Sequence, residues 1–264
     1  MPNLSRDEVD TVIRKARIQL TLSHPFLSMA TLRLPFRAAV NRPWCPTMCT
    51  DGNHVFFNPG WVATLSAAEC MGVIAHEVLH VVLGHVDRRD WRDHRTWNMA
   101  ADFAVNLMLN DHGFKLPAGG LFDKSYRGQT TEQIYDTLIR ATSAERASFS
   151  SNAGGRLKGR RTEATASPGI EHEDLLSPED LRTADLRDAD APDAEQRRLI
   201  RRQLIAEMKT HLHGTTRGFF SNEIEVAVEV AVDWRSVLRR FLFDRVRTDW
   251  QSYPFNKRWI HRDS

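Results

Sequence analysis

One stretch of this chain constrains the fold more than any other: the run 73–83, which is uncharged and apolar except for three residues. A capping box at 66–69 precedes this run and Gly84 follows it, so a helix is predicted from 66 to 84. A helix that is apolar on nearly every side is buried. The fold must therefore enclose this helix and satisfy its three polar side chains, which are His76, Glu77 and His80.

These three residues form a His-Glu-x-x-His pattern. Two imidazoles four residues apart lie on one helix face, about one turn apart, and can share a tetrahedral Zn²⁺. Glu77 is displaced around the helix, where its carboxylate can take a proton from a zinc-bound water. Burying such groups in an apolar helix is costly unless a metal compensates them. We therefore expect His76 and His80 as zinc ligands and Glu77 as catalytic base, rather than two core histidines beside a buried glutamate.

A second buried helix, predicted at 97–109, offers the third ligand. It is apolar except for a stripe of Asn98, Asp102 and Asn106, which recur at every fourth residue on one face. We expect Asp102 to bind the metal and the two asparagines to hydrogen-bond the ligands. The alternatives are an interhelical network without metal, or His85 or His94 as the ligand. On a continuing helix, His85 would face away from His80.

The remaining pattern predicts an α+β domain dominated by helix. Further helices are expected at about 9–22, 130–141 and 195–211, a β-like stretch at 30–34, and an antiparallel hairpin of 47–50 with 54–57 beside the active-site helix. As an edge strand, 54–57 could hold an extended substrate by backbone pairing. The alternative is an ordinary hairpin strand that faces the core.

No residue stands out as the group that stabilises the oxyanion. His85, His94 and Tyr126 are near enough in sequence, but a structural or exposed role is favoured for each. Cys45 and Cys49 lack the second pair that a structural zinc site needs.

Three segments are expected: a core at 1–142 that carries the His-Glu-x-x-His pattern, a linker at 143–194, and a helical segment at 195–264 that packs on the core. The linker has no periodicity, and residues 171–195 hold ten Asp or Glu against two Arg. Such composition favours a flexible, solvated connection over a regulatory flap.

Charge and cysteine content bear on location. The net charge is only +2, from 36 basic and 34 acidic residues, so no global field favours nucleic acid or an anionic membrane. The amino terminus lacks the apolar core of a signal peptide, and no apolar run is long enough to span a bilayer. Three cysteines favour reduced thiols over a disulfide scaffold. We therefore expect a cytoplasmic protein that does not interact with membranes.

Several stretches together resemble a family of bacterial metallopeptidases in which a zincin-like domain precedes a von Willebrand factor A-like domain. Besides 76–85 and 50–59, they include Trp97-Asn98-Met99-Ala100-Ala101-Asp102, Thr131-Glu132-Gln133-Ile134-Tyr135 and Asp233-Trp234-Arg235. The resemblance implies a zinc peptidase that acts on a peptide or protein and has a MoxR-type AAA+ ATPase as partner. It also implies a von Willebrand-like domain after a segment like 250–262, which this sequence does not include.

An alternative class is a metal-binding interaction module without peptidase activity. Residues 233–262 hold seven aromatic side chains among eight Arg or Lys, a mixture that suits a protein interface or single-stranded nucleic acid. An amphipathic helix that packs on the core is the favoured interpretation, and nucleic acid is the least favoured.

We predict that a trace of protease cuts first within the 143–194 segment, since its composition cannot bury enough apolar surface to offset the entropy of ordering. Time-resolved digestion with mass spectrometry locates the first cut. Resistance there equal to that of the helices would mean that the segment is docked on the core.

Overall fold

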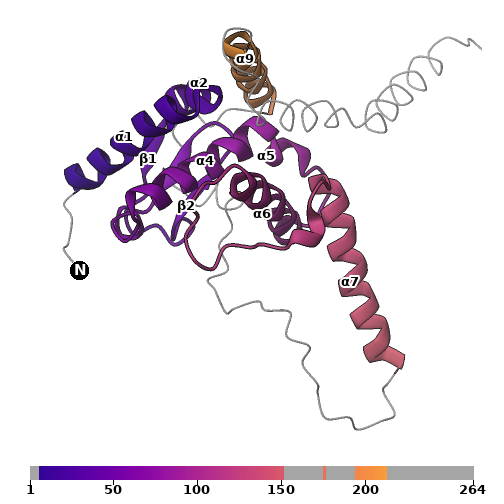
Figure 1. The fold of residues 1–264 in the computed structure, drawn as a ribbon. Coiled ribbons are helices and arrows are strands. Elements are labelled where there is room, and N and C mark those ends of the chain that lie inside the picture. The colour runs from indigo at the N-terminus through magenta and orange to yellow at the C-terminus, as the bar shows by residue number, and fades with distance from the viewer. Residues whose placement is uncertain (1–5, 152–174, 177–193, 213–264) are drawn as a thin grey trace, which may run out of the picture. The chain divides into compact units, whose positions relative to one another are not determined.

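The computed structural model describes residues 6–151, 175–176 and 194–212, and these form an α+β fold dominated by helices (Figure 1). The elements in chain order are α1 Arg6–Ser23, α2 Pro25–Arg33, β1 Phe36–Ala38, β2 Met48–Thr50, β3 Val55–Phe57, α3 Pro59–Val62, α4 Ala67–Leu83, α5 His85–Arg88, α6 His94–Asp111, the 3-10 turn η1 Lys124–Tyr126, α7 Thr131–Ser151 and α9 Ala194–Leu212. Within these ranges no helix has the length and apolar character needed to cross a membrane. The predicted fold class is confirmed. The aromatic and basic segment 233–262 lies outside the described residues.

Helix α4 is the buried helix predicted from the sequence, and both of its ends are fixed. The Ser66 hydroxyl accepts from the Glu69 N–H, and the Glu69 carboxylate accepts from the Ser66 N–H at 2.9 Å, which confirms the capping box. Gly84 ends the helix in the left-handed conformation, with φ of 69°. Two arginine side chains donate to its last carbonyl groups, at 3.0 Å from Arg88 to Leu83 and at 2.9 Å from Arg201 to Val82.

The neighbours of α4 enclose it. Helices α1, α2, α6 and α9 and strand β2 all pack against it, and every residue from Val73 to Leu83 is buried. At Gly72 the chain that follows α6 approaches so closely that a Cβ atom would lie 2.1 Å from the Lys115 carbonyl oxygen. The helix is therefore held on several sides, as a carrier of precisely placed side chains needs to be.

The sheet has three strands in the order β1-β3-β2. Strand β2 pairs antiparallel with β3, which confirms the predicted hairpin, and β1 pairs parallel with β3. The connection is 51–54, where the Asp51 carboxylate accepts from the N–H groups of Asn53 and His54 at 2.7 and 2.6 Å. Because β3 is the central strand, both of its edges are occupied. The prediction that 54–57 offers a free edge to a substrate is wrong.

The β-like stretch predicted at 30–34 is also wrong, because α2 covers Pro25–Arg33. Proline at the first helical position has its backbone preset for a helix, and that start outweighs the local preference of the residues after it. One face of α2 buries Leu27 and Ala30. The strand forms later, at β1, after Pro35.

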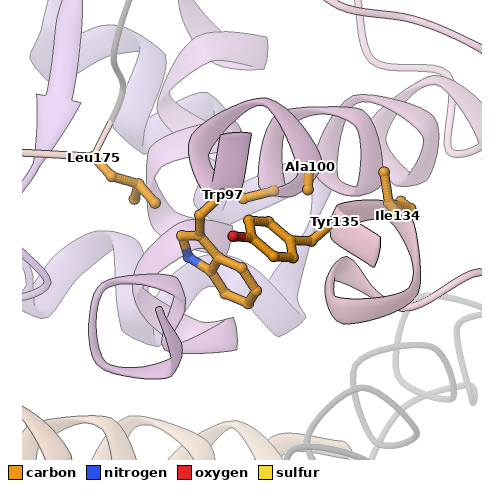
Figure 2. Close-up of a cluster of buried hydrophobic side chains, with 6 residues drawn as sticks. Trp97, Ala100, Ile134, Tyr135 and Leu175 are labelled. Atoms are coloured by element: carbon orange, nitrogen blue, oxygen red, sulfur yellow. The ribbon is translucent and has the colours of Figure 1, made fainter. Parts of the chain in front are cut away.

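Two leucines of the predicted linker lie inside the fold. Leu175 and Leu176 are 2% and 5% exposed, and Leu175 forms a parallel bridge with Thr50 of β2. In Figure 2 the Leu175 side chain lies beside Trp97 of α6, in the cluster that also holds Tyr135 of α7. Helix α7 extends to Ser151, past the predicted boundary at 142, and α9 begins at Ala194. The structure describes no other residue between 152 and 193.

We predict that Gly72→Ala lowers the free energy of unfolding by about 1–3 kcal/mol or more, because the new methyl group overlaps a backbone carbonyl that cannot move aside alone. Gly60→Ala is the matched control. Its Cβ would meet only the Asn58 side-chain oxygen, at 3.3 Å, so its stability should change by less than about 1 kcal/mol. Denaturant unfolding measures both, and equal effects would contradict the prediction.

Candidate metal centre

Three buried side chains converge where α4 faces α6. The two helices contact each other and bring His76, His80 and Asp102 together, with one ligand atom from each within 4.8 Å of the others. His80 Nε2 lies 2.8 Å from His76 Nε2 and 3.3 Å from Asp102 Oδ1, and His76 Nε2 lies 3.7 Å from the same oxygen. These are the three residues that the spacing pattern predicts as ligands.

Asn106 fixes the orientation of the His76 ring. Its side-chain nitrogen donates to the Leu121 carbonyl at 2.9 Å, so its oxygen is the atom that lies 2.9 Å from His76 Nδ1. A carboxamide oxygen only accepts, so His76 Nδ1 carries the proton. In the neutral ring, Nε2 then presents a lone pair to the other two residues, as metal binding requires.

His85 lies behind His80. The left-handed Gly84 turns the chain between α4 and α5, and this turn places His85 Nδ1 3.0 Å from His80 Nδ1. His85 Nε2 lies 3.2 Å from the Thr131 hydroxyl. Burial, followed by the neighbouring His80, holds the pKa of His85 well below its ordinary value, so this ring is neutral. His85 therefore contacts the rear nitrogen of His80 and is not positioned as a ligand.

The contacts of His80 admit two proton arrangements. In one, His85 donates to His80, and His80 Nε2 donates to His76. In the other, His80 Nδ1 donates to His85, His85 Nε2 donates to the Thr131 hydroxyl, and His80 Nε2 is a lone pair. Because a hydroxyl both donates and accepts, Thr131 supports either state. Only the second state leaves two lone pairs facing each other, and a cation between them removes their repulsion.

Asp102 supplies the negative charge of the cluster. Its Oδ2 accepts from Asn98 Nδ2 at 3.2 Å, while Oδ1 is buried and accepts no hydrogen bond of good geometry from the described residues. Burial raises the pKa of the Asp102 carboxyl, but the two facing imidazoles outweigh burial and hold this pKa below its ordinary value. An ionised oxygen is thus directed at the two histidine nitrogens.

The arrangement fits a small tetrahedral cation. Zinc bonds of about 2.0–2.2 Å separate two tetrahedral ligand atoms by roughly 3.3–3.5 Å. The three separations here, 2.8, 3.3 and 3.7 Å, fall on either side of that value. Two imidazole nitrogens with one carboxylate oxygen are also a donor set that suits zinc better than magnesium. All three residues are buried: His80 is fully enclosed, and His76 and Asp102 are 6% and 5% exposed.

Glu77 is also buried, at 1% exposed, on α4 between the two histidines. It is not one of the three residues whose ligand atoms converge. His94 is the first residue of α6, and Tyr126 lies in η1 with its ring 4.9 Å from that of Phe103. Neither residue joins the cluster. Cys45 and Cys49 are buried, form no disulfide and pack in the sheet-side core.

Two supports of the site were not found by sequence reasoning. The expectation that His85 faces away from His80 assumed a continuing helix, but the helix ends at Gly84 and the turn there brings His85 to the back of His80. The glycine directly after the periodic run was the available signal. Leu175 donates from its backbone N–H to Asn98 Oδ1 at 2.9 Å, and an acid-rich composition gave no sign of that contact.

Comparison with known proteins gives one result that covers nearly the whole chain. Residues 9–263 match the model of the family described as "Putative metallopeptidase domain". The searches of curated proteins and of solved structures gave no match.

We predict that Asp102→Ala weakens Zn²⁺ binding by several orders of magnitude, because it removes the only charged donor of the cluster. His85→Ala should retain most of the metal on purification. Its affinity should fall by about 10–100-fold, since only the orientation of His80 is lost. Chelator competition measures both variants. A larger loss for His85→Ala than for Asp102→Ala would make His85 the ligand.

Proposed function

Because this chain belongs to the metallopeptidase family that it matches over residues 9–263, and because three donor atoms converge between α4 and α6, we propose that it is a zinc-dependent peptidase. The convergence of His76, His80 and Asp102 is the observation that carries the proposal. A sequence pattern alone places two histidines on one helix face. The third donor, from a helix twenty-two residues further on, turns that pattern into a site.

Zinc held by three protein ligands keeps a fourth position open, where it lowers the pKa of a water and polarises a carbonyl. Asn106, His85 and Asn98 each hold one ligand from behind, so the inner nitrogen and oxygen atoms stay aimed at a common point. Such preorganisation avoids the cost of reorienting the ligands during the reaction.

Glu77 is the proposed catalytic base. It follows His76 directly on α4 and is buried, and burial strengthens its interaction with any charge that develops nearby. Its carboxylate takes a proton from the attacking water and then delivers that proton to the leaving amine. The substrate class is a peptide or protein.

Two further proposals concern the cellular location of the protein and its protein partner. We place the protein in the cytoplasm, an assignment supported by three buried cysteines that form no disulfide. A MoxR-type AAA+ ATPase as partner rests on the family resemblance alone.

We predict about one Zn²⁺ per purified chain, and that Glu77→Gln keeps both fold and zinc but lowers hydrolysis by about 10²–10⁴-fold or more. The amide is nearly isosteric with the carboxylate but cannot accept the proton. Elemental analysis and a peptide library digested by wild type and variant measure the two effects.

His76→Ala with His80→Ala is the matched control for the metal. Unchanged zinc in this double variant would place the metal elsewhere, and near wild-type hydrolysis by Glu77→Gln would refute the mechanism.

A further inference from the structure

Leu175 and Leu176 lie against the part of the fold that carries the candidate metal centre, although Leu175 is 77 residues beyond Asn98 in the chain. Their side chains point into two different apolar clusters. Leu175 belongs to the cluster that holds Trp97, Ile134 and Tyr135, where its side chain lies beside Trp97 (Figure 2), while Leu176 belongs to the cluster of the sheet side that holds Cys49 and Phe56. Alternation of this kind is what an extended strand produces. The dipeptide therefore contacts both the helical part and the sheet part of the fold.

The backbone of the dipeptide is also engaged on both sides. Leu176 N–H donates to the Thr50 carbonyl at 3.1 Å, on the edge of β2 that β3 does not use. Leu175 N–H donates to Asn98 Oδ1 at 2.9 Å. One N–H thus extends the sheet, and the other reaches the polar stripe of α6.

The hydrogen bond from Leu175 N–H sets the orientation of the Asn98 side-chain amide toward Asp102. A carboxamide presents an oxygen on one side and an NH₂ group on the other, and the two can exchange places by rotation. The Leu175 N–H requires the oxygen on its side, so the NH₂ group must face Asp102, whose Oδ2 accepts at 3.2 Å. Without the Leu175 donor, the rotated amide would set its oxygen against the carboxylate.

We infer that the Leu175 backbone N–H is a positioning group of the metal centre, which acts through Asn98 to hold the Asp102 carboxylate in its ligating orientation. This inference rests on the proposed metal site but not on peptidase activity. Asn98 and Leu175 are each 2% exposed, so water cannot readily replace the lost donor. Because binding equilibria are reciprocal, docking of the dipeptide strengthens metal binding, and metal binding strengthens docking to the same extent.

Proline substitution in the whole chain tests the inference, since proline lacks the backbone N–H. Both proline variants also fix φ and lose a buried leucine side chain, so they are compared with each other rather than with the wild type alone. Leu175→Pro deletes the donor to Asn98. Leu176→Pro is the matched control, because it deletes the donor to Thr50 and leaves the Asn98 contact in place. Zinc affinity by chelator competition should fall about 10–100-fold for Leu175→Pro and less than about threefold for Leu176→Pro. In an Asn98→Ala background, Leu175→Pro should cause little further loss.

Equal zinc affinity of the two proline variants would overturn the inference, as would full additivity with Asn98→Ala. If Leu175→Pro does not fold, hydrogen exchange in the wild type decides instead. Zinc should slow exchange of the Leu175 amide by about tenfold or more relative to the chelated protein, and Asn98→Ala should abolish this effect. An unchanged Leu175 rate refutes the inference. If wild-type zinc binding survives His76→Ala with His80→Ala, the metal site itself is refuted.

Discussion

The structure depends on the cost of placing ionisable groups inside an apolar helix. Helix α4 buries His76, Glu77 and His80 among Val, Ile and Leu side chains, and α6 adds the buried carboxylate of Asp102. Desolvating such groups costs several kcal/mol for each ion unless they are paired or bound to a metal. Every outer atom of the cluster has a protein partner: Asn106 behind His76, His85 behind His80, and Asn98 behind Asp102. The inner nitrogen and oxygen atoms face one another at 2.8 to 3.7 Å, an arrangement that a cation between them would stabilise.

A cluster of this kind requires rigid supports, and the ends of α4 show how the chain provides them. The capping box at Ser66 sets where the helix begins, and Gly84 sets where it ends. Two cationic side chains, Arg88 and Arg201, donate hydrogen bonds to its last carbonyl groups, where the helix dipole favours a positive charge. Arg88 in turn contacts Glu132 of α7 through its guanidinium. The left-handed conformation of Gly84 ends α4 and also turns His85 toward His80. One backbone conformation therefore both ends the helix and orients a side chain of the candidate metal centre.

The sequence was informative wherever a feature is local. Capping boxes, the apolar run of α4 and the polar stripe of α6 each depend on residues three or four apart, so the helices, the hairpin and the convergence of His76, His80 and Asp102 could be predicted. The errors concern tertiary context. Residues 30–34 have local β character, but Pro25 starts a helix that buries Leu27 and Ala30 against its neighbours. That β3 is central could not be foreseen, because its pairing with β1 depends on two segments that no turn signal connects.

Leu175 and Leu176 show the limit of compositional reasoning most clearly. The average composition of residues 143–194 is too polar and too charged to form a core. The residues around the dipeptide dominate that average. Two adjacent leucines nevertheless suffice to fill two existing clusters, because the clusters and the β2 edge are already built by the rest of the fold. What the dipeptide contributes is small in apolar area, but its N–H reaches a buried polar stripe that no water can readily satisfy. A backbone donor of a connecting segment can therefore reach Asp102 of the candidate metal centre through Asn98, and only the three-dimensional arrangement reveals this contact.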